Sequence, residues 1–259
     1  VLAISEDGAS IVPLLGGHHG ANELARELTT ILDGHAAITT AGDLRFGIAL
    51  DDPPQGFVLG NPHNAKPVMA ALLAGASAQL IGEADWLTKS QIPFDENGEV
   101  RLITSEKNVD AGPLDLVFHP QSLIVGMGCE RDAPADEAWA LVESAVEKSG
   151  YARQSIAAVT SIDLKADEHV LHVVAKRLGV PAIFYPAARL EEERDRLHHP
   201  SDIVFGEVGC HGVAEGAALA ASGKNSELVI PKEKSKRVTF AMAKSPDFLN
   251  ESKIMSDTG

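Results

Sequence analysis

The chain has 259 residues, 44% of them hydrophobic and 23% charged, and its formal net charge is −15. This composition is typical of a globular protein, and the length allows two modest domains. We do not expect nonspecific nucleic-acid binding, because neutralising phosphates requires clustered Lys and Arg. No run of about 18 apolar residues occurs, so we expect no membrane partner.

Cys129 and Cys210 are the two cysteines, and neither lies in a CxxC pair. Two cysteines are too few for a disulfide framework, so we expect reduced thiols and a cytoplasmic location. The first ten residues contain no basic segment followed by an apolar core, which argues against a signal peptide. They also lack an initiator Met, and we expect a chain truncated at its start.

Residues 1–75 are predicted to form an N-terminal α/β module. The periodicity of apolar residues and the Gly, Pro and Asn positions define its elements. The expected elements are a strand at Ser10–Leu15, a helix at Ala21–Leu32, a strand at Ala36–Thr40, a loop at 51–64 and a helix at Ala65–Ala74.

Residues 76–120 are predicted to form a small β-rich linking region. Short apolar runs separated by Asn97-Gly98 and Gly112-Pro113 turns indicate its strands. The expected strands are Gln79–Ile81, Glu99–Thr104 and Leu114–Phe118.

Residues 121–244 are predicted to form a C-terminal module, followed by a flexible tail at 245–259. The expected strands are Leu123–Val125, Ser155–Ile162, Val180–Tyr185, Glu227–Ile230 and Arg237–Ala243, and the expected helices are Pro134–Ser149, Asp167–Leu178 and Val213–Ala221. Strands alternating with helices predict βαβ units and a mainly parallel sheet. The predicted fold class is therefore α/β, with two Rossmann-like, mainly parallel βαβ modules joined by the linking region.

Polar residues at the carboxyl ends of parallel strands are the first candidates for a binding site. Gly16 and Gly17 precede a predicted helix, where glycine lets a ligand approach the backbone and free N–H groups point outward. His18 and His19 can donate hydrogen bonds or transfer protons, and Asn22 follows them. The alternative interpretation is a tight turn with solvated histidines.

The segment 126–131 begins like a dinucleotide-binding fingerprint, with Gly126 and Gly128 in the first two glycine positions. Arg131 occupies the third glycine position, which disfavours nucleotide binding. Cys129 has the chemistry of a nucleophile if a neighbouring group lowers its pKa. A small buried residue in a turn is the favoured interpretation of this cysteine.

Ser161, Asp163 and Lys165 alternate at the end of a predicted strand, so an extended backbone would present them on one side. Asp163 and Glu168 are candidate acids or bases, and Lys165 is a candidate partner for a substrate carboxylate. The alternative is an Asp helix cap surrounded by solvated charges.

Glu215 lies near the start of an Ala-rich predicted helix, where a carboxylate also simply favours the helix dipole. Lys232 belongs to one of the few basic segments, which is otherwise a solvated turn. A metal site built from Cys129, Cys210, His211 and a loop histidine does not have the spacing of a zinc motif, so no metal site is predicted.

Taken together, the motifs resemble one family. LLGGHHGANELAREL and ITTAGD resemble the N-terminal module of cobalt-precorrin-5A hydrolases (the CbiG family). Four further motifs resemble the family's C-terminal module in the same order, and this module is also similar to the CobE protein of aerobic vitamin B12 pathways. These motifs are IVGMGCERDAPADE, VTSIDLKADEHVLHVVAKRLGVP, GVAEGAALAASG and ELVIPKEKSKRVTFAMA.

The resemblance implies a function in cobalamin biosynthesis, namely hydrolytic opening of the lactone of cobalt-precorrin-5A with release of acetaldehyde. It implies a tetrapyrrole or corrinoid partner with cobalt present only within the substrate, no cofactor, and an association with precorrin methyltransferases. The residues that we expect to carry out the chemistry are Asp163, Lys165, Glu168 and His18. The expected substrate-binding residues are Gly16, Gly17, His19, Asn22, Thr39, Thr40, Gly126, Gly128, Cys129, Arg131, Ser161, Glu215 and Lys232.

Two other functions stay open on the sequence. The similarity of the C-terminal half to CobE suggests a non-enzymatic corrinoid carrier or escort acting with precorrin methyltransferases. A nucleotide-binding Rossmann module is the third possibility, and Arg131 in place of the third glycine argues against it. Acetaldehyde release distinguishes the hydrolase from the carrier, and binding of ATP or NAD would identify the nucleotide-binding module.

Overall fold

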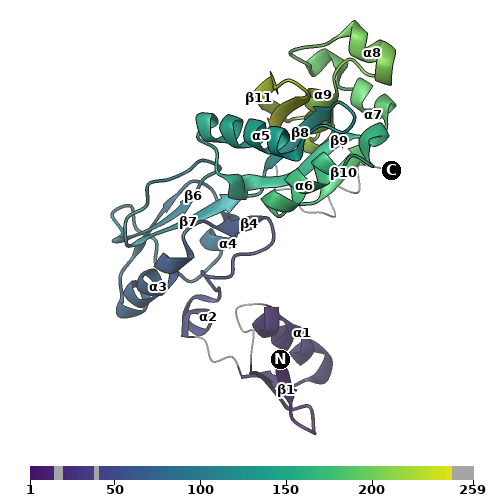
Figure 1. Cartoon of the computed structure of the whole chain (residues 1–259). Helices are drawn as coiled ribbons and strands as arrows, with labels where there is room; N and C mark the ends of the chain where they lie inside the picture. The colour runs from purple at the N-terminus through teal and green to yellow at the C-terminus, as the bar shows by residue number, and fades with distance from the viewer. Residues whose placement is uncertain (15–19, 38–40, 247–259) are drawn as a thin grey trace. The chain divides into compact units, whose positions relative to one another are not determined.

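The computed structural model describes residues 1–14, 20–37 and 41–246 (Figure 1). The chain forms two compact units. The first comprises residues 1–54, 59–105 and 109–118, and the second comprises 55–58, 106–108 and the chain from 119 onward. Helices and mainly parallel sheets occur in both units, which confirms the predicted α/β fold class.

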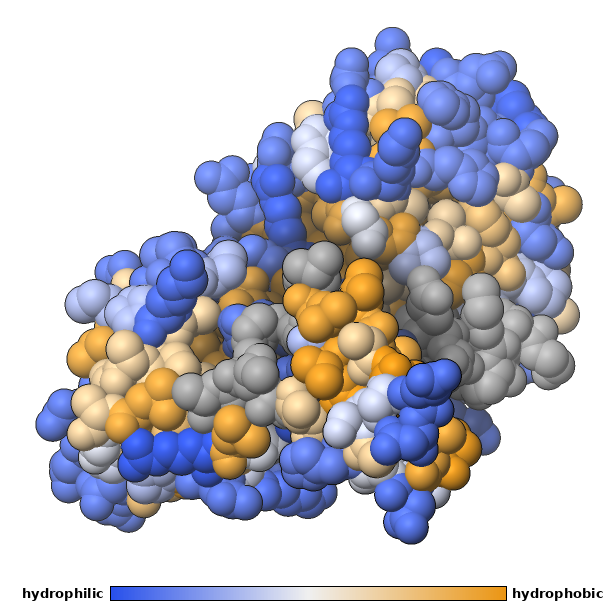
Figure 2. Space-filling view, turned by 90° about the horizontal axis from the view of Figure 1, so that it is seen from below, coloured by the Kyte–Doolittle hydropathy of each residue, from blue (hydrophilic) through white to orange (hydrophobic). Residues whose placement is uncertain are grey.

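The N-terminal part of the first unit contains a three-stranded sheet in the order β1–β2–β3. Its elements are β1 (Leu2–Ile4), β2 (Ser10–Pro13), α1 (Asn22–Leu32) and β3 (His35–Ala36), followed by α2 (Ala41–Phe46). Strand β2 is antiparallel to β1 and parallel to β3. Seven of the twelve large apolar side chains that are exposed among the described residues lie between Val1 and Leu44, and Figure 2 shows apolar patches on one face. This part therefore buries a small core.

A second sheet has the order β4–β7–β6–β5, in which β5, β6 and β7 run parallel. Its elements are β4 (Phe57–Leu59), α3 (Ala65–Ala74), β5 (Ala78–Ile81), α4 (Asp85–Thr88), β6 (Val100–Thr104) and β7 (Asp115–Pro120). The predicted helix and three strands are confirmed. The loop prediction for 51–64 is wrong at β4, because a three-residue strand is defined by its pairing with β7 and leaves no periodicity in the sequence.

The second unit contains a five-stranded sheet in the order β10–β9–β8–β12–β11. Its strands are β8 (Leu123–Cys129), β9 (Ile156–Ile162), β10 (Ala182–Tyr185), β11 (Glu227–Lys234) and β12 (Val238–Lys244). Its helices are α5 (Ala135–Ser149), α6 (His169–Leu178), α7 (Ala187–Glu191), α8 (Asp202–Val208) and α9 (Val213–Ser222). Strands β8, β9 and β10 are parallel, whereas β12 returns antiparallel to both β8 and β11.

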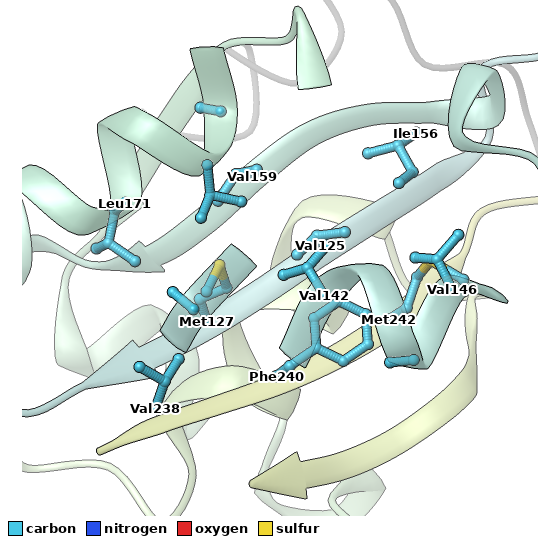
Figure 3. Close-up of a cluster of buried hydrophobic side chains, with 14 of the residues drawn as sticks. Val125, Met127, Val142, Val146, Ile156, Val159, Leu171, Val238, Phe240 and Met242 are labelled. Atoms are coloured by element: carbon cyan, nitrogen blue, oxygen red, sulfur yellow. The ribbon is translucent and has the colours of Figure 1, made fainter. Parts of the chain in front are cut away.

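Helices cover both faces of this sheet, so its central strands β8 and β9 are buried along nearly their whole length. On one face, Val125 and Met127 of β8 pack with residues of α5 and α6, including Val142 and Leu171 (Figure 3). On the other face, Ile124 of β8 packs in a cluster with alanines of α9. Side chains alternate along a strand, so odd-numbered residues of β8 face α5 and α6 and even-numbered residues face α9.

Two glycines of β8 allow close packing, Gly126 against α9 and Gly128 against the neighbouring strand β12. A Cβ atom at Gly126 would overlap the carbonyl oxygen of Ala214 and lie 2.7 Å from the backbone nitrogen of Ala218. A Cβ atom at Gly128 would lie 2.7 Å from Oγ1 of Thr239. The helix can approach the sheet because Gly126 carries no side chain, and because the side of α9 that faces the sheet consists largely of alanines, whose side chains are small.

The structure corrects three local predictions in this unit. Strand β8 continues to Cys129, so 126–129 are not a loop after the strand. Residues Asp163–Lys165 form a 3₁₀ helix, and α6 begins at His169 instead of Asp167. Helices α7 and α8 were not predicted, because each is too short to show a helical period. Among the described residues, no single helix is long and apolar enough to span a membrane, and α8 and α9 meet that test only as a pair bent by 77°.

We predict that Gly126→Ala destabilises the protein, because its Cβ collides with the backbone of α9. The expected cost is about 1–3 kcal/mol of unfolding free energy, measured by urea denaturation. Gly206→Ala is the matched control, because Gly206 lies exposed in α8 with nothing within 4 Å of its added Cβ. The control should leave the stability unchanged or raise it slightly. Equal stability of the two variants would contradict the packing argument.

Candidate functional site

A pocket of about 360 Å³ lies at the carboxyl ends of β8 and β9, entirely within the second unit. This is the edge at which ligands bind in open α/β sheets. The strand ends contribute Gly128, Cys129, Glu130, Ile162 and Lys165; α8 and the start of α9 contribute Val204, Glu207, Val208, His211, Gly212, Val213 and Ala214; β11, β12 and their connection contribute Lys232 and Lys234–Thr239.

The pocket is cationic although the chain carries a formal charge of −15. Five Lys and Arg side chains line it, against two Glu side chains. Lys234 and Lys236 are exposed and form no ion pair within the described part of the chain. The N-terminus of α9 adds the positive end of a helix dipole at Val213 and Ala214. This arrangement favours an anionic ligand.

The cationic turn between β11 and β12 is held in place by α5. Glu137, in the first turn of α5, accepts hydrogen bonds from Oγ of Ser235 at 2.6 Å and from the backbone N–H of Arg237 at 2.7 Å. The Ser235 hydroxyl and then this backbone N–H hold the pKa of Glu137 below its usual value. Arg237 also forms an ion pair with Glu130 at 3.1 Å. These contacts orient the wall of the pocket before any ligand arrives.

Cys129 lines the pocket as a thiol and not as a thiolate. Burial raises its pKa to about 11, and the charge of Glu168 acts in the same direction. Lys165 and Arg131 oppose this shift without overcoming it. At neutral pH the thiol is therefore protonated, and it is a poor nucleophile in this state.

Glu168 forms ion pairs with two of the predicted site residues, Arg131 and Lys165. Its carboxylate is 4% exposed and lies 3.1 Å from Nε of Arg131 and 3.7 Å from Nζ of Lys165. One oxygen, Oε2, accepts the backbone N–H of Asp132, whereas Oε1 accepts no hydrogen bond in the described residues. The buried charge holds Lys165 at the pocket wall by electrostatic attraction.

Glu215 is a buried carboxylate with four hydrogen-bond donors. It accepts the backbone N–H groups of His198, His199 and Lys232 and the ring Nδ1 of His199, at 2.8–2.9 Å. Burial alone would raise its pKa, but these hydrogen bonds, led by that of His199, hold the pKa below its usual value. Glu215 therefore ties β11 and the 198–199 segment to α9, while Nζ of Lys232 donates to the carbonyl of His199.

His211 is a second buried group in the pocket wall, and the sequence had suggested it only as a metal ligand. Its Nδ1 lies 2.8 Å from Oε1 of Glu191, and its backbone N–H donates to Oε2 of the same carboxylate at 2.9 Å. Burial raises the pKa of Glu191, but the two hydrogen bonds from His211 outweigh it and lower the pKa. Ring stacking on Phe205, with centroids 4.5 Å apart, also holds the imidazole in place.

The predicted site residues occupy different environments. Lys165, Glu168, Arg131 and Cys129 are brought together. Asp163 is exposed, and the expectation that it shares one side of a strand with Lys165 is wrong, because Asp163–Lys165 form a 3₁₀ helix.

Two predicted binding residues have packing roles in the sheet. The hydroxyl of Ser161 is buried and donates to the carbonyl of Met127 at 2.7 Å, so it joins β9 to β8. Gly126 is paired on both sides within the sheet and packs against α9, so its expected role as a backbone donor to a ligand is wrong. Gly128 does line the pocket.

Several predicted residues of the N-terminal module cannot be placed. Gly16, Gly17, His18 and His19, and likewise Thr39 and Thr40, lie outside the described residues. Asn22 is described, and it is buried at the first residue of α1. In the described part of the chain, no group of three or more His, Cys, Asp or Glu residues could hold a metal ion, and both cysteines are free.

Sequence reasoning missed the contribution of the β11–β12 turn beyond Lys232. Arg237 and Lys236 reach the pocket because β12 runs antiparallel to β8, which places Val238 beside Cys129. The PKEKSKR segment between the last two predicted strands could have indicated this contribution. When a hairpin pairs antiparallel with a central strand, its turn lies beside the end of that strand.

Comparison with known proteins gives a consistent assignment. The family model described as "Cobalamin synthesis G C-terminus" matches residues 123–243, and "Cobalamin synthesis G N-terminal" matches residues 1–43. The chain is 30% identical to the cobalt-precorrin-5A hydrolase of Priestia megaterium over 270 aligned positions, which cover 95% of this chain and 71% of that protein.

The second half of the chain has its own relative. It is 43% identical over 134 residues to protein CobE from a Sinorhizobium species, which covers 52% of this chain and 87% of that protein. The crystal structure of a CobE from the cobalamin (vitamin B12) biosynthetic pathway is 36% identical, with a TM-score of 0.46, and the match covers 48% of this chain and 91% of that chain.

We predict that Glu215→Gln destabilises the second unit by about 1.5–3 kcal/mol at pH 7, because an amide cannot replace a charged acceptor with four donors. The folded-state pKa of Glu215 is lowered, so its stabilisation is present above the usual carboxyl pKa of 4.5 and is lost as the pH falls below it. Urea denaturation at pH 7 and pH 4 measures the difference. Glu147→Gln, at an exposed position of α5, is the control and should change little.

Proposed function

This chain belongs to the cobalamin synthesis G family, and on that premise we propose that it hydrolyses the lactone of cobalt-precorrin-5A and releases acetaldehyde. Its place in cobalamin biosynthesis follows from the family. The proposal extends to a cytoplasmic reaction that needs no resident cofactor, in which cobalt enters only within the substrate.

The proposed reaction consumes one water molecule. Water adds to the lactone carbonyl, the ester C–O bond breaks, and a carboxylate and an alcohol result. The alcohol then loses its proton as its C–O bond becomes a carbonyl, and the adjacent C–C bond breaks with its electron pair passing to the macrocycle. Acetaldehyde leaves as the two-carbon fragment.

The cationic pocket at the ends of β8 and β9 is the observation that supports this proposal. A tetrapyrrole with acetate and propionate arms is a polyanion, and Lys and Arg side chains are suited to bind carboxylates. Lys232, Lys234, Lys236 and Arg237 form one wall of the pocket. Its volume of about 360 Å³ is at the lower end for pockets that enclose small ligands, so we propose that it takes one edge of the macrocycle.

Within the pocket, we assign Lys165 to stabilising the negative charge that develops on the lactone carbonyl oxygen. Lys165 is largely buried beside Glu168, and the N-terminus of α9 lies on the same pocket. Preorganised positive charge of this kind makes a large contribution to catalysis of acyl transfer. Glu168 positions Lys165, and the predicted participation of Asp163 remains a prediction.

A non-enzymatic corrinoid carrier is the alternative, and the high similarity of residues in the second half to CobE favours it. Such a carrier would use the same cations to bind the substrate arms but would not release acetaldehyde. Association with precorrin methyltransferases remains part of this alternative.

We predict that the full-length protein releases acetaldehyde from cobalt-precorrin-5A, and that Lys165→Met lowers kcat by about 10²-fold. Cys129→Ser should keep kcat within about threefold, because the protonated thiol is not needed as a nucleophile. A coupled aldehyde assay measures both, with Lys176→Met in the exposed last turn of α6 as a charge-matched control.

Two results would contradict these assignments. Loss of turnover in Cys129→Ser with unchanged substrate binding would indicate covalent catalysis. Tight binding of the substrate by the wild-type protein without any acetaldehyde would support the carrier.

A further inference from the structure

We propose that His211 is the general base of this pocket and that Glu191 is its positioning residue. The proposal rests on the hydrolase function proposed above. It assigns a proton-transfer role to a pair of side chains that come from separate segments, the end of α7 and the residues just before α9.

The contacts between the two residues fix both the position and the tautomer of the imidazole. One carboxylate binds His211 twice, through the backbone N–H at 2.9 Å and through Nδ1 at 2.8 Å. Hydrogen bonds from His211 lower the pKa of Glu191 despite the opposing effect of burial, so Glu191 is ionised at neutral pH and can only accept. Nδ1 therefore carries the proton in the neutral imidazole, and Nε2 carries the lone pair.

The surroundings of the ring are also suited to holding a proton temporarily. The side chain of His211 is 9% exposed and stacks on Phe205. Asp202 lies 3.4 Å from Nε2 with a 99% exposed side chain, so its charge can stabilise the imidazolium ion. Glu207 of α8 and Lys232 of β11 are further charged groups that line the pocket, and the charge of Arg194 acts on Glu191.

Other pocket residues that can accept a proton are less well arranged. Glu130 is paired with Arg237, and the exposed side chain of Glu207 forms no hydrogen bond to the described part of the chain. Cys129 is held as a neutral thiol. His211 combines burial, a fixed orientation and direct access to the pocket.

In the proposed step, Nε2 of His211 takes a proton from water as the water oxygen bonds to the lactone carbonyl carbon. The ester C–O bond then breaks, and Nε2–H returns the proton to the departing alkoxide oxygen. The carboxylic acid that forms ionises to solvent. His211 is regenerated neutral, and one water has been added across the ester bond.

The kinetic test uses the full-length protein and the pH dependence of acetaldehyde release. Turnover by the wild type should fall on the acidic side of its pH profile, because a doubly protonated imidazole cannot act as a base. His211→Asn should lower kcat by about 10²–10⁴-fold with KM changed less than about threefold, and it should remove this limb of the pH profile.

Glu191→Gln separates a positioning role from a structural one. Loss of the negative charge destabilises the imidazolium ion, so the limb should move to lower pH by about one unit, with a smaller loss of kcat. A residue that merely supports the fold would lower activity without moving the limb. His198→Asn is the matched control, because His198 is exposed and its only described contact is a backbone N–H bond to Glu215. Circular dichroism and thermal unfolding establish that each variant is folded.

A binding measurement tests the inference independently of turnover. With ¹³C-labelled histidine, the corrinoid polycarboxylate cobyrinic acid should shift the imidazole signal of His211 and leave that of His198 unchanged. Suppose that the wild type releases acetaldehyde and that His211→Asn keeps a normal kcat and the acidic limb of the pH profile. This result would overturn the inference about His211 and leave the hydrolase proposal standing. Absence of acetaldehyde from the wild type would refute the hydrolase proposal, and an unshifted His211 signal would then overturn this inference as well.

Discussion

The approach of α9 to β8 at Gly126 sets the geometry of the second unit. The backbone of α9 lies where a Cβ atom of Gly126 would be, and the helix presents alanines to the sheet. This contact fixes how far along the strand the helix begins. Its first turn, at Gly212–Ala214, therefore lies beside the end of β8, and the segment before it carries His211 to the same place. The position of the pocket therefore depends on the contact between α9 and β8, and these elements carry several of its polar groups.

The charge around the pocket is opposite in sign to the net charge of the chain. The chain as a whole repels anions, yet the β11–β12 turn gathers cations at the end of the central strands. Acidic residues elsewhere contribute to this arrangement instead of opposing it: Glu137 fixes the turn, Glu168 draws Lys165 to the wall, and Glu215 holds the backbone of Lys232. Each of these carboxylates satisfies donors on the protein side and leaves cationic groups directed toward the pocket.

Periodicity predicted the long elements well. Helices with one buried face, such as α5 and α3, place apolar residues at helical spacing, and the buried strand β9 is a continuous, mostly apolar run. The end of β8 was misjudged, because glycines are typical of turns and nothing local shows that a helix packs on them. Lys165, Cys129 and Lys232, which the sequence places near strand ends, line the pocket, and their roles stay predictions.

The remaining part of the site depends on contacts between distant segments. The pairing of His211 with Glu191 spans 20 residues and involves α7, a helix too short to leave a pattern. The sequence favours Asp163 over Cys129 as a catalytic group, because an extended strand would present Asp163 and Lys165 on one side. Asp163–Lys165 form a single turn of 3₁₀ helix instead of an extended strand, so the two side chains do not share one side. A one-dimensional pattern cannot show where a strand stops and the chain begins to turn.

The described residues that line the pocket fall between Gly128 and Thr239, within one unit. A pocket with this property can be inherited as a block, because a gene fusion or fission outside that span leaves these wall residues encoded together. Selection can then vary the neighbouring module while the charges of this pocket are transmitted unchanged.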